Sequence, residues 1–219
     1  MKYLLFTISL ICLLSMKPMK KKRIVFFGDS ITQMGAQKNG YIDLIQTSLN
    51  KKGVAENYEL FGAGIGGNKI YDLYLRLEDD VLSKKPDVVF IYVGINDVWH
   101  KAHGTGTDID RYEKFYNALI TKIEAAGAKV IVCTPTVIGE KKDNANAQDK
   151  DLNAYADIAR KVAAARKCEV VDLQKIFANY IHQNNPENLE KGILTTDGVH
   201  LNAKGNQLVA DAMLVKIIK

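Results

Sequence analysis

Short runs of apolar residues alternate with amphipathic segments along nearly the whole chain. The clearest run covers residues 88–93 and follows Pro86-Asp87, as expected for a strand buried on both faces. Similar runs predict strands at residues 23–27, 58–61, 129–133 and 169–172. Apolar side chains spaced three and four residues apart predict helices over residues 41–52, 70–82, 108–126, 144–167, 177–183 and 203–218. Alternating strands and helices indicate an α/β protein with a five-stranded parallel sheet covered on both faces.

Length and composition are those of a single globular domain. The chain has 219 residues, of which 47% are hydrophobic and 25% charged. This excludes a disordered, collagen-like or polytopic membrane protein. A chain of this size can bury a core without disulfides or metals. No repeat, linker or shift in composition follows residue 23, so we expect one domain over residues 23–219.

The positive net charge is concentrated at the amino terminus. The first 23 residues contain six basic side chains and no acidic ones, whereas the remainder has 24 Lys and Arg against 25 Asp and Glu. The folded body is therefore close to neutral, although the whole chain carries +5. No nucleic-acid partner is predicted.

The first 22 residues have the pattern of a leader segment. Lys2 precedes a mostly apolar, uncharged run at residues 3–15, which is typical of a secretory signal peptide and too short to span a bilayer comfortably. We therefore expect a secreted or periplasmic protein whose mature domain is not embedded in a membrane. No small-x-small cleavage site follows the run. An uncleaved anchor, or a true start at Met16 or Met19, are the alternatives.

Cysteine usage gives no evidence for a metal site. Cys133 lies in an apolar run and Cys168 just before one, so both are interpreted as small buried hydrophobic residues. A disulfide between them stays open. No CxxC or HExxH spacing occurs, and neither a metal nor a cofactor is predicted.

Candidate chemistry follows the predicted strands. Ligands of parallel sheets bind at the carboxyl ends of the strands, where we expect four segments to converge. These segments are Gly-Asp-Ser-Ile at 28–31, the glycine-rich stretch at 62–68, Gly-Ile-Asn-Asp at 94–97, and Asp-Gly-Val-His at 197–200. They supply a hydroxyl, backbone amides, a carboxamide, a carboxylate and an imidazole, which together suit acyl transfer.

Each of these groups has a role in such a reaction. Ser30 can be the nucleophile, because a neighbouring imidazole, that of His200, can remove its proton. Asp197 can orient the ring of His200 and stabilise its charged form. Glycines at residues 62–67 let backbone N–H groups approach a developing oxyanion, and Asn96 can add a side-chain donor.

Each segment taken alone has a simpler interpretation. Asp29 or Ser30 could cap a helix. Residues 62–67 match a GxGxxG nucleotide-binding loop, although after the second strand rather than the first. The Asn-Asp pair at 96–97 could form a turn, and His200 could be structural. The occurrence of all four segments in order favours the catalytic interpretation.

The four segments together resemble the four motifs of the SGNH (GDSL-type) hydrolases, over residues 22–219. The chain departs from the usual pattern at Ile31, where Leu is common, and at Gly62, where Asn is common. The four residues that give the family its name are present: Ser30, Gly64, Asn96 and His200.

The resemblance implies a three-layer α/β/α fold of the flavodoxin type. It also implies ester hydrolysis through an acyl-enzyme on Ser30, without a cofactor. The oxyanion would be bound by the backbone amides of Ser30 and Gly64 and by the side chain of Asn96. An ordinary α/β-hydrolase is disfavoured because no GxSxG sequence occurs.

The loops beside the expected site point to a polar substrate. Neither residues 99–107 nor residues 137–150 form the long apolar lid that an acyl chain would need. We therefore predict a short-chain, acetyl ester, on a small molecule or carbohydrate, with Asp29, Asp97 and Trp99 as substrate-binding residues. Trp99 would stack on a sugar ring, or alternatively pack on the scaffold. A lysophospholipase or thioesterase, and a non-catalytic binding protein, are the alternative functions; the oligomeric state stays open.

Overall fold

The structure is a computed structural model that describes residues 20–218. The expected leader falls almost entirely outside these residues, so the signal peptide stays a prediction. The first strand begins at Lys22, one residue before the expected domain boundary. Within residues 20–218, no helix is long and apolar enough to cross a membrane.

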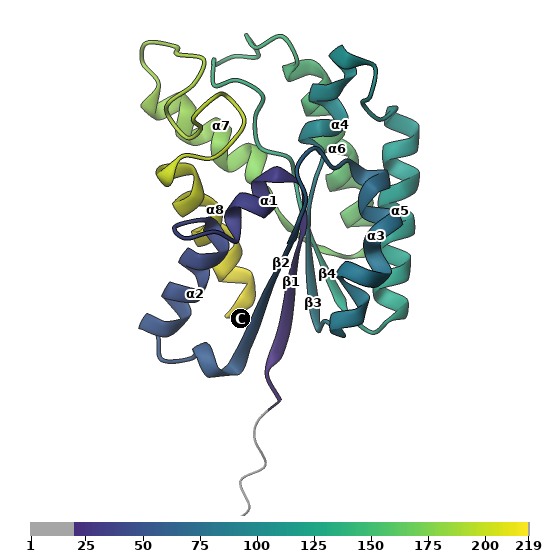
Figure 1. Ribbon diagram of the computed structural model, residues 1–219. Helices are drawn as coiled ribbons and strands as arrows, with labels where there is room; N and C mark the ends of the chain where they lie inside the picture. The colour runs from purple at the N-terminus through teal and green to yellow at the C-terminus, as the bar shows by residue number, and fades with distance from the viewer. Residues whose placement is uncertain (1–19, 219) are drawn as a thin grey trace, which may run out of the picture.

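A five-stranded parallel sheet forms the centre of the molecule, as predicted (Figure 1). The strand order is β2-β1-β3-β4-β5. The strands are β1 (Lys22–Gly28), β2 (Tyr58–Gly64), β3 (Val88–Tyr92), β4 (Lys129–Cys133) and β5 (Glu169–Val171). β1 pairs with β2 and β3, so the residues that follow it leave from an interior strand and not from the edge of the sheet.

Helices cover both faces of the sheet and complete a three-layer α/β/α sandwich. Figure 1 shows α1, α2, α7 and α8 on one side and α3, α5 and α6 on the other. The helices are α1 (Ser30–Gly35), α2 (Tyr41–Lys51), α3 (Ile70–Asp80), α4 (Ile95–Trp99), α5 (Ile109–Ala125), α6 (Asp149–Arg166), α7 (Leu173–Asn184) and α8 (Ala203–Ile217). Short 3-10 turns are η1 (Ala55–Asn57), η2 (Leu82–Lys84) and η3 (His100–His103).

The core follows from the apolar periodicity of these elements. All five residues of β3 are buried, which accounts for its uninterrupted apolar sequence. On α5, the buried side chains recur every three or four residues and face the sheet: Tyr112, Tyr116, Leu119, Ile120 and Ile123. Phe26 of β1 stacks on Phe90 of β3, with ring centroids 5.1 Å apart.

Two helices begin at positions other than those predicted. α6 starts at Asp149 rather than at residue 144, because Asp143 and Asn144 adopt left-handed backbone conformations that a helix excludes. α7 starts at Leu173 rather than at residue 177, because the carboxylate of Asp172 accepts a hydrogen bond from the N–H of Lys175 and caps the first turn. The sequence analysis missed α1 and α4 because both are short and begin inside the motif segments.

Both described cysteines are free thiols. Cys133 is completely buried in β4, and Cys168 is partly buried before β5. The open question of a disulfide is therefore answered in favour of two separate thiols. Among residues 20–218, no group of His, Cys, Asp or Glu is arranged to hold a metal ion.

Candidate active site

Ser30, His200 and Asp197 lie in line at the carboxyl end of the sheet. The Oγ of Ser30 is 3.0 Å from Nε2 of His200, and Nδ1 of His200 is 2.7 Å from Oδ2 of Asp197. A ring with its hydrogen on Nδ1 satisfies both contacts: it donates to Asp197 and accepts from Ser30. This is the arrangement of a nucleophile, a general base and an orienting carboxylate.

Asp197 is itself held by the backbone around it. Its Oδ1 accepts hydrogen bonds from the N–H groups of Val199, at 2.9 Å, and His200, at 2.8 Å. Partial burial raises the pKa of Asp197, but the hydrogen bonds from His200 and Val199 outweigh burial and lower this pKa below its ordinary value. The carboxylate is therefore ionised at neutral pH and can stabilise a charged imidazole.

The end of β2 approaches the start of α1 so closely that only glycine fits at position 64. A Cβ on Gly64 would lie 2.1 Å from the backbone nitrogen of Gln33 and 2.7 Å from the carbonyl oxygen of Asp29. The register of the sheet causes this approach, because Gly64 is the partner of Gly28 in the β1–β2 ladder. The glycine-rich loop is thereby brought against the turn that carries Ser30.

The side chain of Asn96 is placed beside this loop. Asn96 is 3% exposed, at the start of α4, and its Nδ2 donates to the carbonyl oxygen of Asn68 at 3.1 Å. A carboxamide nitrogen carries two hydrogens, so a second donor is left. The N–H of Gly66 donates to Oε1 of Gln33 at 2.9 Å, which joins the loop to α1.

Arg76, which the sequence analysis did not single out, ties these backbone segments together. Its Nη2 donates to the carbonyl oxygens of Gly28, at 2.7 Å, and Ala63, at 3.1 Å. Its Nε donates to Oδ1 of Asn68 at 2.7 Å, and its side chain is only 14% exposed. On the amphipathic α3, an arginine looked like an ordinary surface residue, so no sequence signal distinguished it.

Gly62 stands where the family motif usually has Asn, and Arg76 helps to support the loop that follows it. A Cβ on Gly62 would lie 2.7 Å from Cβ of Ala36, so α1 already occupies the space of a larger side chain. The glycine-rich loop is instead supported by the guanidinium of Arg76 and by Gln33.

Glu140 is a second residue that the sequence analysis missed. It is completely buried, and its carboxylate accepts three backbone N–H groups: from Leu194 at 2.6 Å, from Thr195 at 2.7 Å and from Ile193 at 2.7 Å. These residues lead directly to Asp197. The loop after β4 thus fixes the segment that carries the candidate base, although nothing in a polar loop sequence marked Glu140 as buried.

Asp29 and Asp97, predicted as substrate-binding residues, both lie beneath the site. Asp29 is 2% exposed, and its Oδ1 caps α1 by accepting from the N–H of Ile31. Asp97 is completely buried and accepts from the N–H of Ile70 at 3.1 Å. Burial raises the pKa of Asp29 to about 7 and the pKa of Asp97 to about 6. Their positions favour support of the surrounding backbone; contact with substrate remains a prediction.

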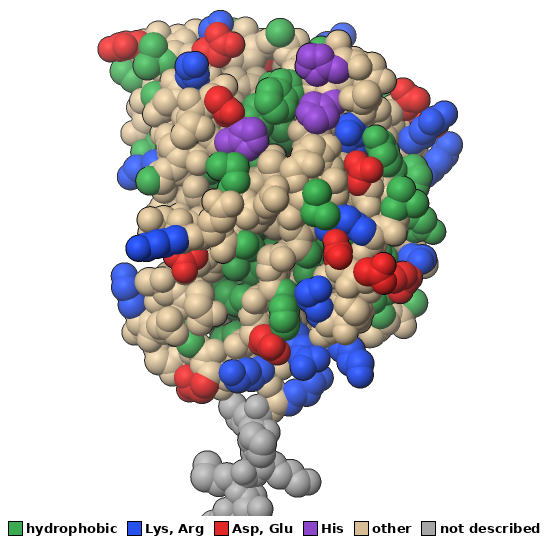
Figure 2. Space-filling view, in the orientation of Figure 1, with side chains coloured by type: hydrophobic (Ala, Val, Ile, Leu, Met, Phe, Trp, Pro, Cys, Tyr) green, Lys and Arg blue, Asp and Glu red, His purple; other side chains and the backbone are tan. Residues whose placement is uncertain are grey.

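Trp99 lies at the edge of the site. Its ring packs edge-on against His200, with centroids 6.3 Å apart, and in a tilted arrangement against His100, with centroids 5.7 Å apart. Trp99, Asp197 and Val199 line a cavity of about 220 Å³. Figure 2 shows histidine side chains beside hydrophobic surface at this end of the molecule. Trp99 is thus both packed on the scaffold and adjacent to the candidate base.

Comparison with known proteins identifies the family. Residues 26–208 match the model of the GDSL-like Lipase/Acylhydrolase family. This match covers most of the chain, which therefore belongs to that family. The predicted family, fold class and enzyme class, a carboxylic ester hydrolase, are confirmed.

Individual relatives carry more specific names. The crystal structure of an acetyl xylan esterase, AlAXEase, is similar with a TM-score of 0.88 and 58% sequence identity, covering 89% of this chain and 99% of that one. An acetylxylan esterase of Geobacillus stearothermophilus is 28% identical over 90% of this chain and 94% of its own. An uncharacterized lipoprotein, YqeF, of Bacillus subtilis (strain 168) is 27% identical over 87% of each chain.

Proposed function

We propose that this protein is a serine esterase that removes acetyl groups from a carbohydrate. The observation that carries the proposal is the continuous contact from Ser30 through His200 to Asp197. Two relatives are named as acetylxylan esterases, which supports an acetyl ester on a carbohydrate as the substrate. The loops at residues 99–107 and 137–150 are mostly polar in sequence, which disfavours the lipolytic alternative.

The chemistry follows from the geometry. The Oγ of Ser30 attacks the acetyl carbonyl carbon as Nε2 of His200 takes its proton. The carbonyl oxygen becomes an oxyanion, which accepts hydrogen bonds from the N–H groups of Ser30 and Gly64 and from Nδ2 of Asn96. Asp197 stabilises the imidazolium that forms.

The acetyl-enzyme then forms and is hydrolysed in a second stage. His200 returns its proton to the leaving sugar oxygen, the carbon–oxygen bond breaks, and an acetyl group stays on Ser30. Water then gives a proton to His200 and attacks the acetyl carbon; the bond from that carbon to Oγ of Ser30 breaks, Oγ takes the proton back from His200, and acetate leaves. Trp99 borders the space where the sugar would lie, and its ring is the proposed platform for a pyranose face.

Hydrolysis assays test this proposal directly. Residues 20–219 would be assayed on p-nitrophenyl acetate, butyrate and octanoate and on acetylated xylo-oligosaccharides. We expect the acetate to react fastest, acetate release from the oligosaccharides, and loss of all activity in Ser30→Ala. Ser83→Ala, which removes an exposed hydroxyl in η2, is the matched control and should keep full activity. Preference for the octanoate would contradict the acetyl specificity, and activity retained in Ser30→Ala would contradict the mechanism.

Export of the protein is a separate proposal. The basic and apolar pattern of the first 22 residues supports it, as does the description of the Bacillus subtilis relative as a lipoprotein. Fractionation of cells that express the full chain would test this, with recovery outside the cytoplasm as the expected result.

A further inference from the structure

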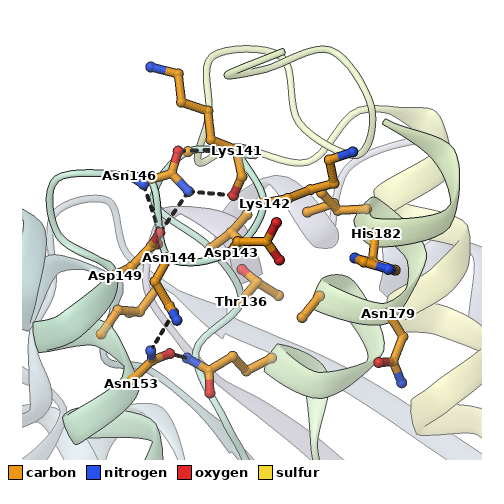
Figure 3. Close-up of a pocket in the computed structure, with 16 residues that line it drawn as sticks. Thr136, Lys141, Lys142, Asp143, Asn144, Asn146, Asp149, Asn153, Asn179 and His182 are labelled. Atoms are coloured by element: carbon orange, nitrogen blue, oxygen red, sulfur yellow. Dashed lines mark hydrogen bonds between the residues drawn. The ribbon is translucent and has the colours of Figure 1, made fainter. Parts of the chain in front are cut away.

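A second cavity, of about 320 Å³, lies next to the candidate active site (Figure 3). Its walls are the loop between β4 and α6, the first turns of α6, and one side of α7. We propose that this cavity binds sugar residues of the carrier chain beyond the acetylated one. This inference rests on the proposed function and makes the preferred substrate an oligosaccharide rather than a monosaccharide ester.

The cavity and the catalytic residues share a common wall. Gly139 and Asn146 line both this cavity and the smaller one beside Trp99 and Asp197. The N–H of Gly139 donates to the carbonyl oxygen of Gly198 at 2.8 Å, so this wall is bonded to the triad segment itself. A sugar chain that occupies the smaller cavity beside Trp99 and Asp197 would therefore lie against the same two residues that border the second cavity.

One side of the cavity presents carboxamides in fixed orientation. Nη2 of Arg160 donates to Oε1 of Gln174 at 2.8 Å, and Nε2 of Gln174 donates to Oδ1 of Asn153 at 3.0 Å. Nδ2 of Asn153 donates in turn to Oδ1 of Asn144 at 2.9 Å. Because a guanidinium can only donate, every amide in this series has a single orientation. The series ends on the amide nitrogen of Asn144, which has no acceptor among residues 20–218.

Other lining residues, on the loop after β4 and on α7, present polar groups without partners. In the described part of the chain, the side chains of Lys142, Asn179 and His182 make no hydrogen bond or ion pair. Figure 3 shows Lys142 extending from the loop toward His182 on α7, across the cavity. Polar side chains that are free on two facing walls can each contact a ligand at no cost in broken protein hydrogen bonds.

The balance of charge indicates what kind of ligand fits. The lining contains two lysines, Lys141 and Lys142, and two aspartates, Asp143 and Asp149, so the cavity has no strong preference for either sign of charge. Carboxamides offer both donors and acceptors, which is what a hydroxyl needs because it also does both. A neutral polyhydroxylated ligand, such as a pentose or hexose residue, therefore suits this lining better than an anion or an acyl chain.

Filling the cavity tests the inference. Ala178 is exposed on α7 and lines the cavity, so Ala178→Trp would occupy it; Gln183→Trp, on the same helix but outside the lining, is the matched control. We would measure kcat/KM for an acetylated xylo-oligosaccharide divided by kcat/KM for p-nitrophenyl acetate. We expect Ala178→Trp to lower this ratio about tenfold and Gln183→Trp to leave it unchanged. Asn179→Ala, a milder change, should lower it in the same direction.

A binding measurement makes the two proposals separable. Calorimetric titration with unacetylated xylobiose and xylohexaose needs no catalysis; we expect binding of the longer chain to wild type and its loss in Ala178→Trp. Equal ratios and equal binding in wild type and both Trp variants would overturn the inference while leaving the esterase proposal intact. Failure of wild type to release acetate from any substrate would overturn the esterase function. The titration would still decide whether the cavity holds a sugar chain.

Discussion

The two halves of the candidate site are built in different ways. The nucleophile half consists of Ser30, the loop after β2 and the start of α4, all of which directly follow strands of the sheet. The histidine half, residues 185–202, has no helix or strand and contains one isolated β-bridge, between Thr195 and Leu201. Backbone register, supported by the side chain of Arg76, positions the first half, whereas the second has no strand register and depends on side chains such as Glu140.

This difference determines which residues each half depends on. Close backbone approach is decisive in the nucleophile half, so glycine at position 64 is required. Buried polar side chains are decisive in the histidine half: Glu140 accepts three N–H groups, and the buried Asn185 donates to the carbonyl oxygens of Glu140 and Leu189. Substitutions in the two halves should therefore impair activity and stability in different ways.

The largest expected effect comes from Asp197→Asn, at the end of the histidine half. The amide removes the negative charge that stabilises imidazolium and favours the wrong tautomer of His200, so kcat should fall about 10³- to 10⁴-fold. Initial rates on p-nitrophenyl acetate would measure this, with circular dichroism to verify the fold. A decrease of less than tenfold would show that Asp197 is not the orienting group.

Gly64→Ala tests the nucleophile half. The added methyl would press on the backbone of Gln33 and Asp29, so we expect a loss of about 1–3 kcal/mol in the free energy of unfolding and about a hundredfold loss in kcat/KM. Gly127→Ala is the control for backbone strain alone, because nothing lies within 4 Å of the added methyl but φ is +84°; it should lower stability and leave kcat/KM unchanged. Equal activity losses in the two variants would argue against a specific role for the contact at Gly64.

Glu140→Gln tests whether buried acceptors position the histidine half. One carboxylate oxygen becomes an NH₂ group that cannot accept, so an N–H in residues 193–195 loses its partner. We expect about 2 kcal/mol lower stability in urea and about tenfold lower kcat, with KM little changed. Glu190→Gln, at an exposed ion pair with Lys141, should change neither quantity appreciably. A normal kcat in a destabilised Glu140→Gln would mean that the segment holds His200 without this support.

The smallest effect on activity is expected in Asp97→Asn, which should change stability alone. The pKa of Asp97 is raised by burial to about 6, so between about pH 4 and pH 6 the folded protein retains a proton that the unfolded chain has lost. Wild-type stability therefore decreases as pH rises through this window, and Asn removes that decrease. At pH 8 the variant should be more stable by about 2–3 kcal/mol, and at pH 4 nearly equal. Urea unfolding at both pH values measures this; an advantage that is larger at pH 4 would contradict it.

The sequence predicted the five strands and the four motif segments because both are local patterns. Ser30, Gly64 and Asn96 each follow a strand, so strand prediction alone placed them at one edge. Arg76 and Glu140 could not be predicted, because each acts on backbone groups that are distant in the sequence. The separation is 48 residues from Arg76 to Gly28 and 54 residues from Glu140 to Leu194. The start of α6 was missed for a local reason, the left-handed residues Asp143 and Asn144.

The direction of β1 has a practical consequence for attaching the protein to a surface. Lys22 begins this strand at the end of the sheet opposite to Ser30, and its seven residues span roughly 20 Å (Figure 1). A linker joined ahead of Lys22, whether to a resin or a carrier domain, would therefore hold the catalytic edge outward. Polymeric substrates could then reach the immobilised enzyme, whereas coupling through lysines at 141–142 would turn that edge toward the support.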